Sequence, residues 1–337
     1  MSDTQAPSRP VVTGRRLFIL SAVLLGLTVA VGVACSFIGR LEFSWAVWWQ
    51  FRVFRLLVAA IVGAGLSVAG MALQGLLRNP LADPYILGIS SGAGVGYLVG
   101  LTAAPLLHWP ELAATPVATL LGAAATCLLV YGLSQRRGRL DPYVLLLSGV
   151  IVNVMNGAVI LAIMMFLLPN RIIEFIGWGM GRVPEWLWMQ PALLATCAVG
   201  VAGGWVAIFL RGSAMNALGL GDEVASSSGV GVHGLRIETF GVVSLMTAAS
   251  VALAGPIGFL GLIVPHVCRL IGGPDHRQLA ILSGFVGAMF LMATDTFCRM
   301  AGVWIGRGEI PLGVVTAFCG GPFFIFLLRR HGREGRL

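Results

Sequence analysis

The chain has 337 residues, of which 57% are hydrophobic and only 11% are charged, and its formal net charge is +8. A water-soluble domain carries roughly 25% charged residues, so this chain cannot cover a water-facing surface and its surroundings must be lipid. All 22 basic residues are arginine. A Walker A loop needs a lysine on the nucleotide phosphates, so any ATP hydrolysis must belong to another chain.

The basic residues are scattered between apolar runs, a pattern typical of membrane topology, in which cytoplasmic loops retain arginine. Nucleic-acid binding is not expected, because it needs clustered basic residues with interleaved aromatics. Metal binding and disulfides are not expected either, because no cysteines have CxxC spacing and most lie in apolar runs as small hydrophobic groups. The cysteines are Cys35, Cys127, Cys197, Cys268, Cys298 and Cys319.

The first sixteen residues are polar and contain Pro7 and Pro10, and an apolar run follows from Leu17 to Ile38. A cleaved signal peptide would have a shorter apolar core and a small-residue cleavage site. We therefore expect residues 1–16 to be a cytoplasmic tail and the apolar run to be an uncleaved first span.

Ten apolar stretches approach the length of about 20 residues that a helix needs to cross a bilayer. The eighth is short and is interrupted by glycine and proline. They predict an all-α integral membrane protein, with one polytopic domain over residues 17–330 and a cytoplasmic tail at 331–337. The predicted spans are 17–38, 56–77, 85–105, 115–133, 143–168, 189–210, 239–255, 258–270, 279–298 and 311–328.

The arginines also predict the orientation of these spans. With the N-terminus inside, fifteen of the 22 arginines fall on inner segments and seven on outer ones. The positive-inside rule therefore favours a cytoplasmic location for both termini.

The longest polar stretch, residues 211–238, is predicted to lie inside between spans six and seven. Its alanine, leucine and valine residues, together with Asp222 and Glu223, indicate one or two short helices. Glycine breaks such helices. The expected break points are Gly219, Gly221, Gly229 and Gly231.

The segment Leu73–Gly92 contains two pairs of turn formers, Asn79-Pro80 and Asp83-Pro84. Such pairs end one helix and start the next. The small polar residues Ser90 and Ser91 are expected inside the helix that follows.

The segment Ala254–Arg269 is apolar but is broken by Pro256 and Pro265. A broken helix at membrane depth is tolerated only where it packs on protein or lines a cavity. His266 is not expected to bind a metal, because no second ligand lies at helical spacing from it.

Asp295 and Arg299 are four residues apart near the outer end of the ninth predicted span. This spacing indicates an ion pair within one helix. An ionisable residue in a span is also a functional candidate in its own right.

These segments resemble the FecCD/BtuC-like family, the permease subunits of type II ABC importers for iron-siderophores, haem and cobalamin. The resemblance runs from about Arg52 to Arg330. The motifs that carry it are Leu73–Gly94, Gly219–Val230, Ala254–His276 and Glu309–Arg330.

The resemblance implies a type II ABC importer permease fold in a bacterial inner membrane, with a second permease copy, as a homodimer or a pair of related subunits, around a central pathway. It also implies two separate ATPase subunits, which hold ATP and Mg, and a periplasmic or lipid-anchored substrate-binding protein. The chain itself is expected to bind no cofactor or metal and to catalyse no reaction.

In the family, the cytoplasmic stretch between spans six and seven docks into the ATPase. The resemblance assigns this role to Gly219, Leu220, Gly221, Asp222, Glu223, Val224, Ala225 and Gly229. Short helices on a loop with glycine hinges suit the transmission of a rigid-body motion. A plain interhelical loop is the alternative.

Arginines on the outer surface of the family pair with glutamates of the binding protein. The matching positions here are Arg52, Arg55 and Arg299, which also fall outside in the predicted topology. Charge pairs at such a rim set registration and encounter rate. The family's RLPR sequence is replaced by Arg52-Val53-Phe54-Arg55, which lacks the proline. The alternative to binding-protein contact is that these arginines only extend their charged ends to the water at the membrane interface.

The resemblance also places Asn79 and Leu81 at the cytoplasmic gate of the pathway. A second gate segment of the family is rich in small hydroxyl residues, but here it contains Asp141-Pro142, so no role is assigned to it. Arg182 stands where the family often has serine, near the predicted cavity mouth, and we hypothesise that it attracts an anionic chelate.

The predicted function is the import of a metal chelate, with a ferric siderophore favoured and haem or cobalamin still open. An ion-coupled secondary transporter is the alternative. Such transporters often place ionisable groups near the membrane midplane, whereas the only candidate here, Asp295, lies near the end of a span. An intramembrane enzyme is not favoured, because no HExxH, GxSxG or paired acids occur within a span.

Overall fold

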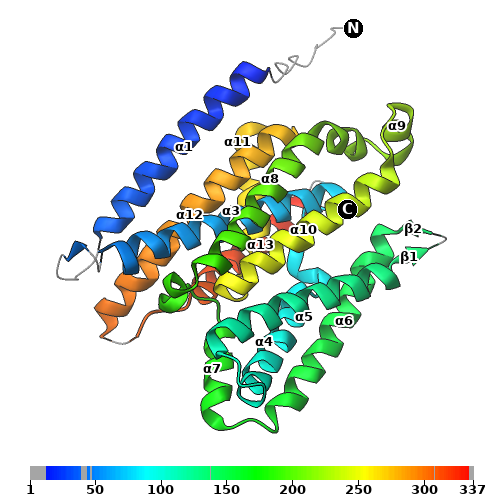
Figure 1. The fold of residues 1–337 in the computed structure, drawn as a ribbon. Coiled ribbons are helices and arrows are strands. Elements are labelled where there is room, and N and C mark those ends of the chain that lie inside the picture. The colour runs from blue at the N-terminus through cyan, green and yellow to red at the C-terminus, as the bar shows by residue number, and fades with distance from the viewer. Residues whose placement is uncertain (1–12, 39–43, 46–47, 137, 307, 334–337) are drawn as a thin grey trace, which may run out of the picture.

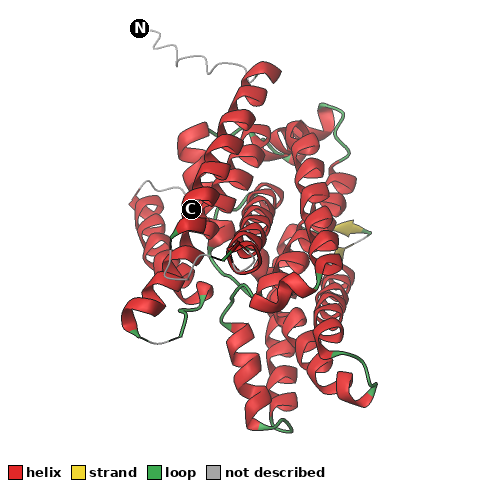
Figure 2. Ribbon diagram, turned by 60° about the vertical axis from the view of Figure 1, so that its left-hand side comes forward, coloured by secondary structure: helices red, strands yellow, loops and turns green. Residues whose placement is uncertain are grey.

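The computed structural model describes residues 13–38, 44–45, 48–136, 138–306 and 308–333, and helices make up nearly all of this part (Figure 2). The strands β1 (Gln135–Arg136) and β2 (Arg139–Leu140) form a small antiparallel hairpin. Three short helices are η1 (Trp48–Val53), η2 (Pro84–Leu87) and η3 (Glu185–Met189). The α-helices are α1 (Gly14–Phe37), α3 (Phe54–Leu77), α4 (Ile89–Leu106), α5 (Glu111–Leu133), α6 (Pro142–Met164), α7 (Pro169–Gly179), α8 (Pro191–Gly219), α9 (Asp222–Ser227), α10 (Val232–Ala254), α11 (Leu260–Gly272), α12 (His276–Ile305) and α13 (Leu312–Arg333).

Eight helical segments in the described part of the chain are long and apolar enough to cross a membrane. They are α1, the continuous run of η1 and α3, α4, α5, α6, α8, α10 and α12. Two shorter apolar helices, α11 and most of α13, correspond to the eighth and tenth predicted stretches. Every predicted stretch therefore has a helix, and the all-α membrane fold is confirmed.

The boundaries of the predicted elements differ at two places. The fifth predicted stretch, 143–168, ends as a helix at Met164, and the separate helix α7 follows because Pro169 starts a new first turn. The polar stretch 211–238 is largely helical, because α8 continues to Gly219 and α10 begins at Val232. The link between these two helices is short and carries α9.

Helix α3 lies at the centre of the bundle and packs against α8, α10, α11 and α12. Close approach depends on facing glycines: a Cβ on Gly63 would overlap the backbone of Gly287, and one on Gly70 would overlap the backbone of Gly261. Such small-residue contacts hold helices together in lipid, where no hydrophobic drive between helices exists. Helix α1, by contrast, lies along the outside against α12 (Figure 1).

The helices alternate in direction along the chain, so the connections gather at two opposite ends of the bundle. We call the end with α9 and the hairpin β1–β2 the α9 face, and the end with α7 and η1 the α7 face (Figure 1). The sequence predicts that the α9 face is cytoplasmic.

The break between α10 and α11 lies inside the bundle. Ile257 is completely buried there, and its amide donates a hydrogen bond of 2.8 Å to the Tyr85 hydroxyl of η2. The backbone of this break is thus packed on protein, as the prolines of the segment predict.

Candidate functional site

The helix α9 projects from the α9 face between two glycines with positive φ, Gly221 at +127° and Gly229 at +81°. These backbone conformations are ones that other residues rarely adopt, so the glycines define where the short helix starts and stops. Ala225 is buried against the body of the protein, whereas Leu220 is 75% exposed and Val224 is 44% exposed. Exposed apolar side chains therefore lie both on α9 and on the link that precedes it.

The first residue of α9, Asp222, ties this helix to two other elements. Its carboxylate accepts hydrogen bonds from Arg236 of α10, at 2.9 Å, and from Arg78 at the end of α3. Arg236 is only 12% exposed, while Arg78 is 40% exposed. The predicted docking segment is thus linked through one carboxylate to the turn that follows α3.

That turn contains the predicted gate residues. Arg78 has a φ of +49°, the left-handed conformation that ends α3. The side chain of Asn79 then accepts a hydrogen bond of 3.0 Å from the Leu81 amide, which is the turn expected of an Asn-Pro pair. The structure therefore joins the predicted docking residue Asp222 to Arg78, which directly precedes the predicted gate residue Asn79.

The next residue pair in this turn starts η2. Asp83 accepts a hydrogen bond of 2.9 Å from the Tyr85 amide, as an N-cap residue does. Burial raises the pKa of the Asp83 carboxyl to about 6 and also raises the pKa of Tyr85. The Tyr85 hydroxyl accepts from the Ile257 amide in the α10–α11 break, so the turn after α3 is joined to the interior of the bundle as well as to α9.

At the α7 face, Asp295 is the centre of a buried cluster of charges. It is 0% exposed, and the Nε of Arg55 donates to both of its oxygens at 2.9 and 3.1 Å. The predicted pair with Arg299 is present, with Nε and Oδ2 3.3 Å apart. The other edge of the Arg55 guanidinium binds Glu309, with distances of 3.1 and 2.7 Å. We call these four residues the rim cluster.

Of the three predicted outer arginines, Arg52 and Arg55 are buried, and Arg55 and Arg299 are paired with acids of the same chain. Arg52 and Arg55 are each only 6% exposed, and Arg52 donates to the Ser36 carbonyl at 2.9 Å. Arg55 is neutralised by two acids from the same chain, which sequence spacing could not indicate. Glu309, with a side chain 44% exposed, is the accessible member of the cluster. It begins the sequence motif Glu309–Arg330, but no feature of the sequence assigns it a role.

Arg182 lies beside α7. It is exposed, and its backbone amide donates to the Ala254 carbonyl at 2.8 Å. It lines a cavity of about 150 Å³ together with Tyr97 and Trp178, whose rings stack at 4.5 Å. Pockets for drug-sized ligands measure about 300–1,000 Å³, so this cavity is too small to hold a chelate.

Helix α7 is held on α5 by Arg171, which sequence reasoning did not single out. Its guanidinium binds Glu111 of α5 and Glu174 of α7, the latter at 3.1 Å. Hydrogen bonding to Glu111 and then to Glu174 raises the pKa of Arg171 above its ordinary value.

Comparison with known proteins identifies the class that this fold and these sites define. The sequence profile of the FecCD transport family matches residues 16–330, and the chain belongs to that family of type II ABC importer permeases.

Among its relatives, the vitamin B12 import system permease protein BtuC of Vibrio cholerae serotype O1 is 38% identical, covering 92% of this chain and 94% of the relative. The hemin transport system permease protein HmuU of Yersinia pestis is 35% identical, covering 87% and 85%. The Fe(3+)-citrate import system permease protein YfmD of Bacillus subtilis is 33% identical, covering 93% and 94%.

A solved structure described as an inward-facing conformation of a metal-chelate type ABC transporter has a TM-score of 0.79 to this chain. It is 28% identical in sequence, and the match covers 93% of this chain and 99% of the other.

Proposed function

We propose that the chain moves a metal chelate inward across the membrane, with two ATPase subunits bound at the α9 face and a substrate-binding protein at the α7 face. One observation carries this proposal. Helix α9 and the link before it expose Val224 and Leu220, and the first residue of the helix, Asp222, is bonded to Arg78 in the turn that holds Asn79 and Leu81. The same short helix can therefore receive a movement and pass it to the gate.

The proposed mechanism follows from these contacts. ATP binding in the partner would favour one position of α9 over another, and this differential affinity would shift the permease between inward-open and outward-open populations. Asp222 binds Arg78, so a movement of α9 would displace Arg78, and Arg78 directly precedes Asn79 in the chain. Arg236 connects the same carboxylate to α10, so that α10 moves with the docking helix.

The coupling is tested with Asp222→Asn, Arg78→Gln and the double variant, in the permease assembled with its ATPase and reconstituted in vesicles. Exposed ion pairs contribute at most about 1 kcal/mol to stability, so all three variants should fold. We expect transport per ATP hydrolysed to fall several-fold in each single variant, and the double variant to be no worse than the more impaired single one, because both act through one contact.

A matched control is Glu238→Gln, which breaks the exposed Arg211–Glu238 pair between α8 and α10 on the same face without touching the gate turn. It should leave transport per ATP unchanged. Losses that multiply in the double variant would contradict the shared contact. The variant Val224→Asp places a charge on the exposed apolar surface of α9. It should abolish the association of the ATPase with the permease.

The binding protein is proposed to contact Arg52, Arg55 and Arg299 at the α7 face. Because Glu309 already occupies the outer edge of Arg55, a carboxylate of the binding protein would exchange with Glu309. We expect Arg299→Glu to weaken capture of the cognate binding protein and Glu309→Gln to strengthen it, both more at low salt than at high salt. Equal affinity in all variants would remove this assignment.

A second copy of the chain is proposed to pack against α6. This helix is apolar but largely exposed, and near its middle it presents the exposed amide of Asn153. An unsatisfied polar group facing hydrocarbon is costly, so contact with another subunit or with the aqueous pathway suits this face. Cysteines at position 153 that cross-link between two copies in the membrane would support the homodimer, and labelling by a lipid-soluble reagent alone would contradict it.

The proposed cargo is a ferric siderophore, with cobalamin and haem as competitors. The relative named for Fe(3+)-citrate carries a ferric chelate, while two other relatives are named for vitamin B12 and hemin. Uptake of each labelled chelate by cells with and without this chain identifies the cargo. An ion-coupled transporter is disfavoured because Asp295 is bound by two arginines; transport by the purified chain on an ion gradient alone would reverse that judgement.

A further inference from the structure

Helices α3 and α12 pack against each other, and both extend from the rim cluster to the α9 face. Helix α12 has 30 residues, so at 1.5 Å per residue it is about 45 Å long. The hydrocarbon core of a bilayer is only about 30 Å thick. Neither helix contains an internal proline, which is a common cause of a sharp kink. Each one therefore joins the two faces as an uninterrupted helix.

Two contacts hold α3 and α12 together. In the rim cluster, Arg55 of α3 donates to both oxygens of Asp295 in α12, and that carboxylate is 0% exposed. Further along both helices, Gly63 faces Gly287 so closely that a Cβ on either residue would overlap the backbone of the other. A buried ion pair at one end and a backbone contact further along leave one helix little room to slide past the other. We call α3 and α12 together the strut.

The end of the strut at the α9 face is bonded to α8 through Asn216. The Nδ2 of Asn216 donates to Oδ2 of Asp275 at 2.9 Å. Its Oδ1 accepts from the His276 amide at 2.8 Å and lies 2.7 Å from Nδ1 of the same residue. One turn earlier in α8, a Cβ on Gly212 would lie 2.9 Å from the amide nitrogen of Arg277. The last turns of α8 therefore have to move with the start of α12.

The strut reaches the predicted docking segment from both of its helices. Asn216 lies in the last turn of α8, and only Leu220 and Gly221 separate α8 from the start of α9 at Asp222. The Asp222 carboxylate is bonded to Arg78, which directly follows α3. Helix α12 thus holds α9 through α8, and α3 holds it through Arg78.

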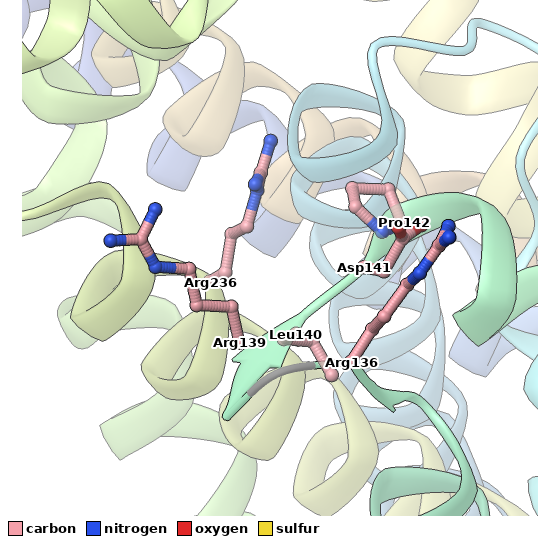
Figure 3. A pocket seen from close by; sticks show the side chains of 6 residues that line it. All are labelled: Arg136, Arg139, Leu140, Asp141, Pro142 and Arg236. Atoms are coloured by element: carbon pink, nitrogen blue, oxygen red, sulfur yellow. The ribbon is translucent and has the colours of Figure 1, made fainter.

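A further bond to α9 comes from outside the strut. Arg236 of α10 binds the same Asp222 carboxylate at 2.9 Å. Figure 3 shows the Arg236 guanidinium in the wall of a cavity next to the hairpin β1–β2, on the same side as that of Arg139, with Asp141 and Pro142 from the start of α6 beside them. Because α9 is bonded both to the strut and to α10, a shift of the strut relative to α10 would displace α9.

We propose that the strut couples the two partner sites, so that contact of the binding protein with the rim cluster displaces α9 and the ATPase that it holds. A binding-protein carboxylate that replaces Glu309 on Arg55 alters the charges around Asp295, where α3 and α12 are joined. Asn216 is the positioning residue of this coupling, because it fixes α12 to the docking segment. This role rests on the proposed function, which supplies both partners.

Such coupling is reciprocal. If the binding protein changes the affinity of the complex for nucleotide, nucleotide changes the affinity for the binding protein by the same factor. The test uses the permease assembled with its ATPase in lipid nanodiscs, and measures the dissociation constant of the binding protein with and without a non-hydrolysable ATP analogue. The ratio of the two constants is the coupling factor, and factors of about 5–150 are typical.

The variant Asn216→Asp places two carboxylates next to each other, because the group that donates to Asp275 becomes an acid. Substitutions in a coupling network change the coupling by about 2–30-fold, so we expect the coupling factor to move toward one by this amount. The affinity for the binding protein without nucleotide should stay the same, because the rim cluster is not altered. A purely structural role of Asn216 would lower the melting temperature without changing the ratio.

The exchange variant Asn216→Asp/Asp275→Asn restores a donor and an acceptor to this contact. The amide at position 275 can donate to the carboxylate at position 216, and its oxygen can still cap α12 as Oδ1 of Asp275 does. The coupling factor should return to the value of the unmodified chain. The matched control is Glu238→Gln, which breaks the exposed pair with Arg211 at the same end of α8 and should leave the coupling factor unchanged.

The variant Asn216→Ala removes the same bonds without adding a charge, so it serves where two adjacent carboxylates prevent folding. Three outcomes would overturn the proposed coupling: an unchanged factor in both single variants, an equal fall in Glu238→Gln, and an exchange variant as uncoupled as the single ones. A chain that assembles with no ATPase would overturn the proposed function as well. An unchanged ratio in an assembled complex would remove only the role of the strut.

Discussion

The rim cluster permits a quantitative prediction for Asp295→Asn. Asp295 is 0% exposed and is the only acid, among the described residues, that binds both Arg55 and Arg299. In the variant, Arg299 loses its acidic partner and Arg55 keeps only Glu309, while both guanidiniums remain at most 14% exposed. Breaking a buried ion pair by removing one partner costs about 3–5 kcal/mol.

For a chain of this size, about 1 kcal/mol changes the melting temperature by about 2 °C, so we expect Asp295→Asn to melt about 6–10 °C below the unmodified protein. The assay is thermal unfolding of the purified chain in detergent. The control Glu111→Gln, which breaks a partly exposed pair with Arg171, should lower the melting temperature by about 2 °C or less.

The double variant Arg55→Gln/Asp295→Asn should recover part of the loss, because it no longer buries an arginine without its acid. A melting temperature of Asp295→Asn within 2 °C of the unmodified protein would show that the cluster does not have the energetic role inferred from its burial.

Two further predictions concern stability. Gly70→Ala should destabilise the protein by about 1–3 kcal/mol, because the new methyl group overlaps the Gly261 backbone and forces α3 from α11, whereas Gly203→Ala, with open space around it, should not lower the melting temperature. Burial raises the pKa of the Asp83 carboxyl from 3.8 to about 6, so the folded protein favours the protonated form. The unmodified protein therefore loses free energy of unfolding as the pH rises from about 4 to about 6, whereas Asp83→Asn, which does not ionise, keeps it. Between pH 4 and pH 7 the variant should gain up to about 3 kcal/mol in free energy of unfolding relative to the unmodified protein, and a difference in melting temperature that does not change with pH would refute this.

The positions of the spans could be predicted from the sequence because a bilayer imposes a length and a hydropathy that are local properties. The same holds for the helix breaks at Asn79-Pro80 and at Gly221 and Gly229, where turn chemistry is decided by one or two residues. Helix α7 is not predicted from the sequence, because it lies after the fifth predicted stretch, 143–168, and its polar residues Arg171 and Glu174 interrupt the hydropathy that marks a span.

The ion pairs across the fold could not be predicted. Arg55 and Glu309 are 254 residues apart in sequence, and Arg78 and Asp222 are 144 apart. No periodicity or spacing connects such residues; only the packing of α3 against α12 and the fold of the link after α8 bring them together. The sequence therefore indicates an acid only for Arg299, at helical spacing from Asp295, whereas the fold also supplies Arg55 with two acids.

The hydrogen bond from the Ile257 amide to the Tyr85 hydroxyl gives the turn after α3 a second attachment, inside the bundle. On its other side, this break touches the segment before η3, because the Arg182 amide donates to the Ala254 carbonyl. Hydrogen bonds and short stretches of chain thus connect Asp222 at the α9 face to Tyr85, to the α10–α11 break and to Arg182 before η3. If the two faces open in turn, as the proposed mechanism requires, at least one of these hydrogen bonds must break, and Tyr85→Phe removes the one between η2 and the α10–α11 break.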